Sequence, residues 1–534
     1  MKVQNSWARI AAVGGLFALA TVLTITTCTS ADQSHTDGDE VTSTPQNEEE
    51  SADPSSPPAS LLVTASPEDA LITIDGGLES TGVLEVGEIP EGDHRIRVSR
   101  PGYEPREKVV ALVSDHLHTL EISLEPREFA VDIDVYPAAD YEIRRHGETL
   151  HRGETPLSHT LPAGKVTIAI EREDYQPFER AFHLDRSVEK KLYLDRPGQL
   201  LRRTGKFRSG GSPKASHFSR DGSEIWVARL MDKTAGVKVL DARTGESVAD
   251  VDLDGAGAVE LAMSDDGKKV YASQMETARV FEIDAHSKKV LRTFETGSSW
   301  TKVLELSSDE SFLLASNWVG NDVSLIDLDT GELERRIPTV DTPRGLYLTS
   351  GGNTLYVAGF DNGELQRIDL ETGESEIIFD RGGSLRHIAA DEWSGKMFIS
   401  DLRYNLIWQM DMDTEEVSLF TRPDFSPNTI VLDPSAQILF VSCRGRTHPS
   451  GNYYKPGHEW GSVLLYDTED ATLLDAIVGG NQPTGLDVTA DGRRLVFSNF
   501  LDSNLEVYDV PSYEALRAGG GGRADVYRRE LAKH

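Results

Sequence analysis

The strongest constraint on the fold is a turn that recurs seven times in the second half of the chain. In each copy an aspartate ends an apolar, strand-like segment and opens the turn, as at Asp241, Asp284, Asp327, Asp369, Asp411, Asp467 and Asp509. Successive aspartates are 42 or 43 residues apart, except for an interval of 56 between Asp411 and Asp467. Each repeat has room for about four short strands, which is the content of one β-propeller blade.

The two ends of the repeat predict that the propeller is closed. The chain leaves the last repeat after residues 505–508, so this repeat lacks its outer strand. Residues 199–207 have the outer-strand pattern, and we expect them to complete the last blade and leave no open sheet edge. We therefore predict a seven-bladed β-propeller over residues 198–510, closed by this N-terminal outer strand, and a flexible tail over residues 511–534 that ends in a short helix or a frayed end.

The repeat unit resembles a known family. It combines a Ser-x-Asp-Gly turn, as at residues 219–222, with an Asp-x-x-Thr-Gly-Glu turn, as at residues 241–246. These motifs resemble the YVTN family of propellers, which includes surface-layer and YncE-like periplasmic proteins. The resemblance spans residues 199–510 and implies the fold. Lactonase-like enzymes share this architecture, so the resemblance does not imply one function.

Two shorter segments precede the propeller, at residues 61–127 and 128–197. Both alternate apolar and polar residues with Gly and Pro at intervals, which predicts short β-strands. The matching motifs are Pro67, Asp75-Gly76 and Gly102-Tyr103 in the first segment, and Pro137, Thr155-Pro156 and Tyr175 in the second. Both segments resemble PEGA domains, which are small β-sandwiches common in bacterial envelope proteins. We predict that they are spacers or adhesion modules, and the whole chain is predicted to be all-β.

The N-terminal segment predicts export. Residues 1–27 carry Lys2, Arg9 and an apolar stretch just before Cys28, which is typical of a signal sequence. The segment resembles a bacterial lipoprotein signal, which implies that Cys28 is acylated and that a lipid anchor attaches the chain to the membrane. Plain secretion and an uncleaved anchor are the alternatives. Residues 28–60 are rich in acids, Ser, Thr and Pro, so we predict an acidic disordered tether in the periplasm or at the cell surface.

Composition excludes several classes of function. Lys and Arg number 54 against 88 Asp and Glu, and the net charge of -34 argues against nucleic acid as a partner. The two cysteines exclude a disulfide scaffold and a zinc site built from several thiolates. Cys443 lies in an apolar run and is predicted to be a buried structural thiol. We expect no cofactor.

A basic ring is predicted at the centre of the propeller. Alignment of the repeats places one residue of each at the start of the innermost strand, and these are Lys214, Val259, Lys302, Arg344, Arg386, Asn428 and Thr484. Four of the seven are basic, and converging cations would focus the electric field on an anionic group. His387 and Glu260, one position further along, would add a titratable pair. The alternative is that these side chains pair with acids of neighbouring blades or lie in solvent.

The long interval reveals an insertion in the sixth repeat, at residues 444–460. Long loops on a rigid scaffold often carry function, and we expect this loop to lie near the ring. Its candidate ligand-binding residues are Arg444, Arg446, His448, Tyr453, Tyr454, Lys455, His458 and Trp460, and an equivalent short loop adds Trp318. The alternative is a loop that packs on the blade only to complete its shape. His448, His458 and Glu459 carry metal-ligating atoms, but their spacing matches no compact motif, so we predict no metal site.

These features predict an envelope-anchored binding protein that presents a propeller to a cell-envelope glycan or protein. No catalytic residues are assigned. One alternative is a lactonase-like hydrolase that uses His387 or His448 as its base, with the ring arginines stabilising a developing anion. The other alternative is a structural protein of the surface-layer type.

Overall fold

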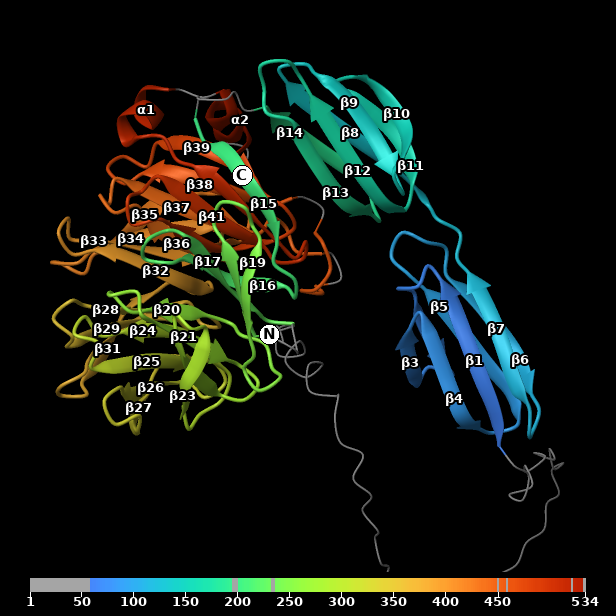
Figure 1. Cartoon of the computed structure of the whole chain (residues 1–534), viewed down its shortest axis with the longest axis horizontal. Coiled ribbons are helices and arrows are strands. Elements are labelled where there is room, and N and C mark those ends of the chain that lie inside the picture. Colours follow the sequence, from blue (N-terminus) through green and yellow to red (C-terminus); the bar gives the residue numbers. More distant parts are fainter. Residues whose placement is uncertain are drawn as a thin grey trace, which may run out of the picture. The chain divides into compact units, whose positions relative to one another are not determined.

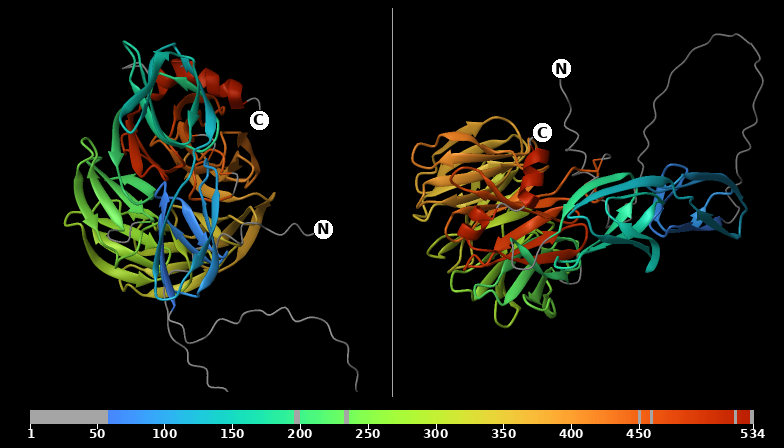
Figure 2. Two further views of the ribbon diagram at one scale, coloured as in Figure 1. Left: turned by 90° about the vertical axis from the view of Figure 1, so that its right-hand side faces the viewer. Right: turned by 90° about the horizontal axis from the view of Figure 1, so that it is seen from above.

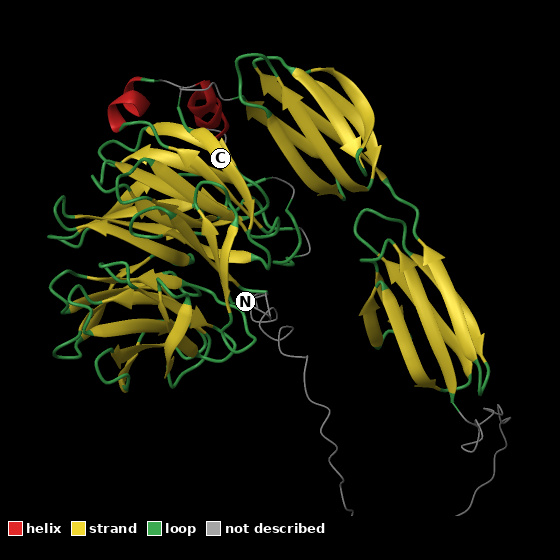
Figure 3. Cartoon of the chain, viewed as in Figure 1, coloured by secondary structure: helices red, strands yellow, loops and turns green. Residues whose placement is uncertain are grey.

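The computed structural model describes residues 58–194, 200–231, 236–448, 451–457, 460–519 and 522–531. The chain divides into two compact units, Met1–Pro126 and Arg127–His534, which are described separately. Strands make up almost all of the regular structure in the described residues, as Figure 3 shows. The prediction of an all-β chain is confirmed. The signal segment, Cys28 and nearly all of the acidic segment lie outside the described residues.

The first unit is a two-sheet sandwich, called here the first sandwich. Its strands are β1 (Ala59–Ser66), β2 (Leu71–Ile74), β3 (Leu78–Thr81), β4 (Val83–Ile89), β5 (Gly92–Ser99), β6 (Arg106–Leu112) and β7 (Leu117–Ser123). One sheet has the order β4-β1-β7, with β1 and β7 parallel, and the other has the order β3-β2-β5-β6. Alternate residues of the strands face the space between the sheets, as shown by Leu61, Val63, Ile96 and Val98, which are buried.

The second unit begins with a sandwich of the same design, called here the second sandwich. Its strands are β8 (Glu128–Tyr136), β9 (Asp140–Arg145), β10 (Glu148–Glu154), β11 (Leu157–Pro162), β12 (Gly164–Glu171), β13 (Phe178–Leu184) and β14 (Val188–Tyr193). The sheet orders are β11-β8-β14 and β10-β9-β12-β13, again with one parallel pair, β8 and β14. The two sandwiches therefore have the same topology, strand for strand.

Seven four-stranded antiparallel sheets follow in the second unit, consistent with propeller blades (Figure 1). Six of them use consecutive strands: β16 (Pro213–Phe218), β17 (Glu224–Arg229), β18 (Val237–Asp241), β19 (Ser247–Val251); β20 (Leu261–Met263), β21 (Lys269–Gln274), β22 (Arg279–Asp284), β23 (Lys289–Glu295); β24 (Thr301–Leu306), β25 (Phe312–Asn317), β26 (Asp322–Asp327), β27 (Leu333–Pro338); β28 (Pro343–Leu348), β29 (Thr354–Gly359), β30 (Glu364–Asp369), β31 (Ser375–Asp380); β32 (Leu385–Asp391), β33 (Lys396–Asp401), β34 (Leu406–Asp411), β35 (Val417–Thr421); β36 (Pro427–Leu432), β37 (Ile438–Cys443), β38 (Ser462–Asp467) and β39 (Leu473–Val478).

The seventh sheet combines the two ends of this region. It contains β40 (Pro483–Val488), β41 (Arg494–Asn499) and β42 (Asn504–Asp509), and its outer strand is β15 (Arg202–Arg208). Strand β15 pairs antiparallel with β42, with Phe207 opposite Leu505. The outer strand expected before the first repeat therefore does complete the last sheet.

Six of the seven recurring aspartates end the third strand of their sheet and accept local hydrogen bonds, whereas Asp509 accepts hydrogen bonds from Arg202 of β15. The Oδ1 atom of Asp241 accepts hydrogen bonds from the backbone N–H groups of Arg243, at 2.9 Å, and Thr244, at 2.7 Å. Asp327 and Asp411 accept the equivalent bond at 2.7 and 2.8 Å. These backbone donors hold the pKa of each aspartate below its usual value. The sequence repeat is thus turn chemistry, in which a side chain satisfies backbone groups that the strands leave free.

The hydrophobic core of this region lies between neighbouring sheets. For example, Trp226 and Val239 of one sheet pack with Val270 and Phe281 of the next, and all four are buried. Cys443 is buried in a similar cluster, where burial raises the pKa of its thiol. Such a thiol is a weak nucleophile, which agrees with a packing role.

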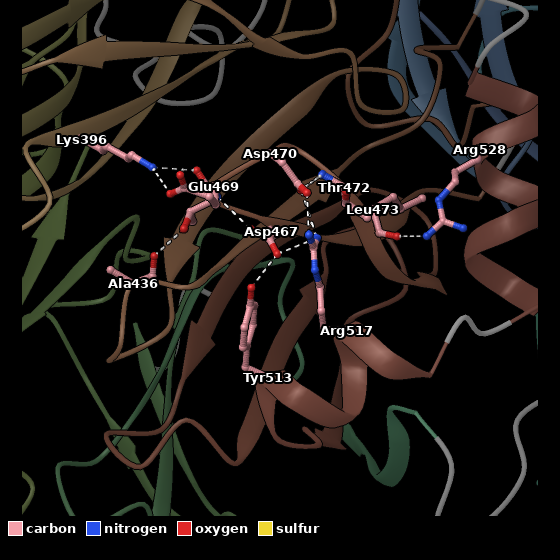
Figure 4. Close-up of polar contacts among 11 residues, drawn as sticks. Lys396, Ala436, Asp467, Glu469, Asp470, Thr472, Leu473, Tyr513, Arg517 and Arg528 are labelled. Atoms are coloured by element: carbon pink, nitrogen blue, oxygen red, sulfur yellow. Dashed lines mark hydrogen bonds and ion pairs between the residues drawn. The ribbon is translucent and has the colours of Figure 1, made fainter.

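The C-terminal segment, for which we expected a flexible tail ending in a short helix or a frayed end, contains two helices, α1 (Tyr513–Ala518) and α2 (Gly522–Leu531). Figure 4 shows how α1 is attached to the turn after β38. Tyr513 donates a hydrogen bond to Asp467 at 2.7 Å, and Arg517 lies 2.8 Å from Asp467 and 2.6 Å from Asp470. Helix α2 contacts β39 and β14, beside the second sandwich (Figure 2). No helix in the described part of the chain is long and apolar enough to cross a membrane.

Candidate functional site

Four basic side chains occupy the same position at the start of four inner strands. Lys214, Lys302, Arg344 and Arg386 are each the second residue of β16, β24, β28 and β32, respectively. All four side chains are buried, with exposed fractions of 9%, 6%, 3% and 3%. With Arg444, which follows β37, they are called here the basic ring. Cations are rarely buried to this degree without carboxylate partners, because leaving water costs several kcal/mol for each ion.

The electrostatics place these five cations in one environment. Burial, followed by the charges of Arg444, Arg344, Arg386 and Lys302, holds the pKa of Lys214 well below its usual value. Burial and the neighbouring arginines likewise lower the pKa of Lys302. The pKa of Arg344 falls to about 10, again mainly through burial. Each cation is therefore close enough to the others to oppose their charge.

Aromatic rings support the two lysines. The Nζ atom of Lys302 lies 3.1 Å from the centroid of the Trp318 ring and 5.7 Å from that of Trp300. Trp318 in turn contacts Trp300 and Phe360, with centroids 5.8 and 5.7 Å apart. Lys214 lies 5.0 Å from the centroid of Phe500. An aromatic face stabilises a cation without cancelling its charge.

The two ring arginines on β28 and β32 have no counter-ion among the described residues. The Nη1 atoms of Arg344 and Arg386 are buried and have no hydrogen-bond partner among the described residues. None of the four strand cations lies within ion-pair distance of a carboxylate in the part of the chain that the structure describes. Among the described residues, the carboxylate that influences the pKa of both arginines is that of Glu260, which lies 3.6 Å from His217. This arrangement is suited to an added anion, because guanidinium groups donate to carboxylate and phosphate oxygens.

The first part of the insertion joins the basic ring. The hydroxyl oxygen of Tyr453 accepts a hydrogen bond from Arg444 Nη2 at 2.9 Å and another from Lys214 Nζ. Gln482 holds the segment in place by donating to the backbone oxygen of Tyr453 at 2.9 Å. Tyr454 packs edge-on against Tyr453, and 51% of it is exposed.

The second part of the insertion departs from our expectation. Trp460, expected to bind ligand, is 5% exposed and belongs to the core of the second sandwich. Its ring centroid lies 6.0 Å from that of Phe178 and 5.4 Å from that of Phe182. His448 is also buried and points to the second sandwich, with Nε2 3.8 Å from Asp185 Oδ2. The reason is that the large apolar ring of Trp460 gains more from burial than from a place on the surface. His458 lies outside the described residues.

The remaining candidate, His387, lies on β32 next to Arg386. Burial and the charge of Arg386 lower its pKa to about 3, and its Nδ1 atom is buried without a hydrogen-bond partner among the described residues. A side chain with this pKa is a weak general base at neutral pH. Among the described residues, no group of three or more His, Cys, Asp or Glu could hold a metal ion.

Two features of this region were missed at the sequence level. One is Trp300, which lies two residues before Lys302 and contacts it; the signal available was the pair of tryptophans that flank β24 and β25. The other is the ion pair of Arg180 on β13 with Glu506 on β42, in which Nη1 and Oε1 are 3.2 Å apart. No local pattern indicates that pair, because its two residues come from different domains of the sequence.

Comparisons with known proteins agree with the first part of this architecture. Residues 59–128 match the model of the PEGA domain, close to the limits of 61–127 predicted above. Among solved structures, the chain is similar to hydrazine synthase of Kuenenia stuttgartiensis, with 18% identity and a TM-score of 0.49, over 56% of this chain and 96% of that one.

A curated relative is more informative. The chain is 32% identical over 331 residues to antigen Lp49 of Leptospira interrogans serogroup Icterohaemorrhagiae serovar copenhageni. The alignment covers 60% of this chain and 72% of the relative. At this identity over most of the relative's length, the chain belongs to the family of antigen Lp49.

Proposed function

We propose that this protein is an envelope-associated binding protein in which seven blades form a closed β-propeller and the basic ring captures an anionic ligand. The pairing of β15 with β42 supports closure, since it joins the first outer strand to the last sheet. Contacts between neighbouring inner strands support it too, and they include the contact of the first, β16, with the last, β40. Inner strands in such an arrangement bring their first residues together around one axis.

The observation that carries the binding function is the burial of cations that have no carboxylate partner among the residues that the structure describes. Lys302, Arg344 and Arg386 stand on three successive inner strands, and each is at most 6% exposed. An unpaired buried cation destabilises the folded chain, so this arrangement is costly unless an anion completes it. An anionic glycan or cell-wall fragment supplies such a group, and an acidic segment of a partner protein is the alternative.

A hydrolytic function fits the environment of the two candidate histidines less well than anion binding does. His387 has a pKa of about 3, and His448 lies beside Asp185 of the second sandwich. Neither histidine is therefore suited to act as a general base at the ring. A purely structural surface-layer role would use exposed residues, whereas the four strand cations of the ring are buried.

We also propose that the chain is an exported lipoprotein, acylated at Cys28, and that the second sandwich is a second PEGA domain with YVTN-type repeats after it. The signal-like N-terminus supports export. The PEGA match, the shared strand order of the two sandwiches and a relative named as an antigen support an envelope location.

The test of binding is a calorimetric titration of the full chain with acidic and neutral envelope sugars. We expect heat of binding with oligogalacturonate and none with neutral glucose oligomers. The variant Arg344→Gln/Arg386→Gln should lose binding, because it removes both unpaired guanidinium groups. The control variant Arg243→Gln/Lys289→Gln changes the net charge equally at two exposed positions and should bind as the native chain does. Equal binding by both variants would contradict a site at the ring.

A further inference from the structure

The charge balance of the basic ring indicates the chemical class of the anion. This inference rests on the proposed function, because it assumes that the ring binds an anion. Five cations influence one another: Lys214, Lys302, Arg344, Arg386 and Arg444. Among the described residues, two carboxylates are principal electrostatic influences on them, Glu260 on the arginines and Asp361 on Lys302. The carboxylate of Glu260 is already engaged with His217. The ring therefore holds more positive charge than a single negative charge can balance.

The donors of the ring come from several elements. Arg344 and Arg386 lie at the same position of β28 and β32, two inner strands that contact each other. Lys302 lies at that position of β24, which contacts β28. Lys214 and Arg444 come from β16 and from the segment after β37. A compact group with several charged oxygens can accept hydrogen bonds from several of these donors, whereas one carboxylate has only two oxygens.

The aromatic residues around the ring contact its cations. Trp318 faces Lys302, and Tyr453 lies under both Lys214 and Arg444, with centroid distances of 4.9 Å. These rings keep the lysines in place without supplying a negative charge. Recognition at the ring is thus dominated by charge.

We propose that the basic ring binds a compact oxyanion that carries at least two negative charges, either a phosphoryl group or a polycarboxylate, and that it discriminates against monovalent anions. The pKa shifts of the two lysines agree with this assignment. Burial and the surrounding arginines lower the pKa of Lys214 and Lys302, while Asp361 acts in the opposite direction on Lys302. A multivalent anion reverses part of this effect and favours the charged lysines, so affinity should increase as the pH falls.

The experiment is a titration of the full chain with pyrophosphate, citrate and acetate at constant ionic strength. We expect pyrophosphate and citrate to bind at least about tenfold more tightly than acetate, because the attraction grows with the charge of the anion. Comparison of pyrophosphate with citrate distinguishes a phosphoryl ligand from a polycarboxylate. In Arg344→Gln/Arg386→Gln the affinity for the preferred anion should fall at least about tenfold. The Arg243→Gln/Lys289→Gln control should keep the native affinity.

The outcomes separate this inference from the proposed function. If acetate binds as tightly as pyrophosphate and the ring variant weakens both, the ring is an anion site but its preference for multivalent anions is refuted. If no anion or acidic sugar binds, both proposals fail. If the ring variant binds pyrophosphate like the native chain, the site lies elsewhere and both proposals fail as well. The single variant Lys302→Met repeats the test should the double variant not fold.

Discussion

The two sandwiches have the same strand order but different surroundings. The first sandwich, through Pro126, forms a compact unit with its own core, whereas the second belongs to the same unit as the seven four-stranded sheets. The core of the second sandwich even includes a residue from outside it, Trp460. The same fold thus forms a compact unit by itself in the first sandwich and part of a larger compact unit in the second.

Part of the difference lies in one strand. β6 and β13 have equal length and the same register against the preceding strand, with Leu112 opposite Gly92 and Leu184 opposite Gly164. Equivalent positions hold Arg106, Lys108 and Val110 in β6 but Phe178, Arg180 and Phe182 in β13. The two phenylalanines contact Trp460, and Arg180 reaches Glu506. These three residues of β13 therefore contribute to the docking surface, together with Lys190 of β14, whose Nζ atom lies 5.7 Å from the centroid of the Trp460 ring.

The largest expected effect comes from removing the aromatic anchor. Trp460→Ala leaves a cavity among Phe178, Phe182 and Arg180, and we expect it to lower the free energy of unfolding by about 3–5 kcal/mol. The second sandwich should then become sensitive to limited proteolysis at a lower denaturant concentration. Trp393→Ala is the matched control, because this tryptophan is 98% exposed and its removal should have little effect. Equal loss in the two variants would refute the comparison.

The next effect concerns the buried ion pair. In Arg180→Ala the carboxylate of Glu506, which is 0% exposed, loses the charge 3.2 Å away, and we expect a loss of about 3 kcal/mol in urea unfolding. Lys108→Ala removes the equivalent residue of the first sandwich, which is exposed, and should stay within about 0.5 kcal/mol of the native chain. A similar cost at both positions would mean that the docking contact is not what distinguishes them.

The same pair predicts how stability depends on pH. Burial alone would raise the pKa of Glu506, but Arg180, Arg203 and Lys206 outweigh it and hold the pKa below the usual 4.5. A carboxyl group with a lowered folded pKa stabilises the chain above the unfolded value and loses that contribution as the pH falls through the folded value. We therefore expect the difference in stability between the native chain and Glu506→Gln to shrink in acid unfolding curves below about pH 4.5. A constant difference would show that the ionised form gives no advantage.

The smallest expected effect is a small gain in stability, opposite in sign to the losses above. It contrasts Arg180, which pairs with Glu506, with the two buried arginines of the ring. Arg344→Met/Arg386→Met removes two buried guanidinium groups whose Nη1 atoms have no partner among the described residues. We expect the chain to be unchanged or about 1 kcal/mol more stable, in contrast to Arg180→Ala. Thermal unfolding without added anions measures this. A marked loss of stability would indicate that the arginines serve the fold and not a ligand.

Much of the architecture was accessible from sequence because it depends on local chemistry. The Asp turns hydrogen-bond to residues two or three positions away, so their spacing marked the sheets and the sixth-repeat insertion. The outer strand before the first repeat was also found by its pattern. A short helix near the C-terminus was one of the expected alternatives, but α1 was missed, because it is held by Asp467 and Asp470, distant in sequence, and has only six residues.

The insertion at residues 444–460 shows what local sequence patterns cannot predict. The sequence indicated aromatic and basic residues in one loop but not that Tyr453 faces the basic ring while Trp460 enters a different domain. The different positions of Tyr453 and Trp460 depend on which surfaces lie close to each end of the loop. The sequence by itself determined the all-β repeat and the equivalent positions of the ring residues, since both follow from strand periodicity and turn hydrogen bonds. Only the tertiary structure decided which charges are paired, because burial and the distance between residues far apart in the chain set the energy of an ion.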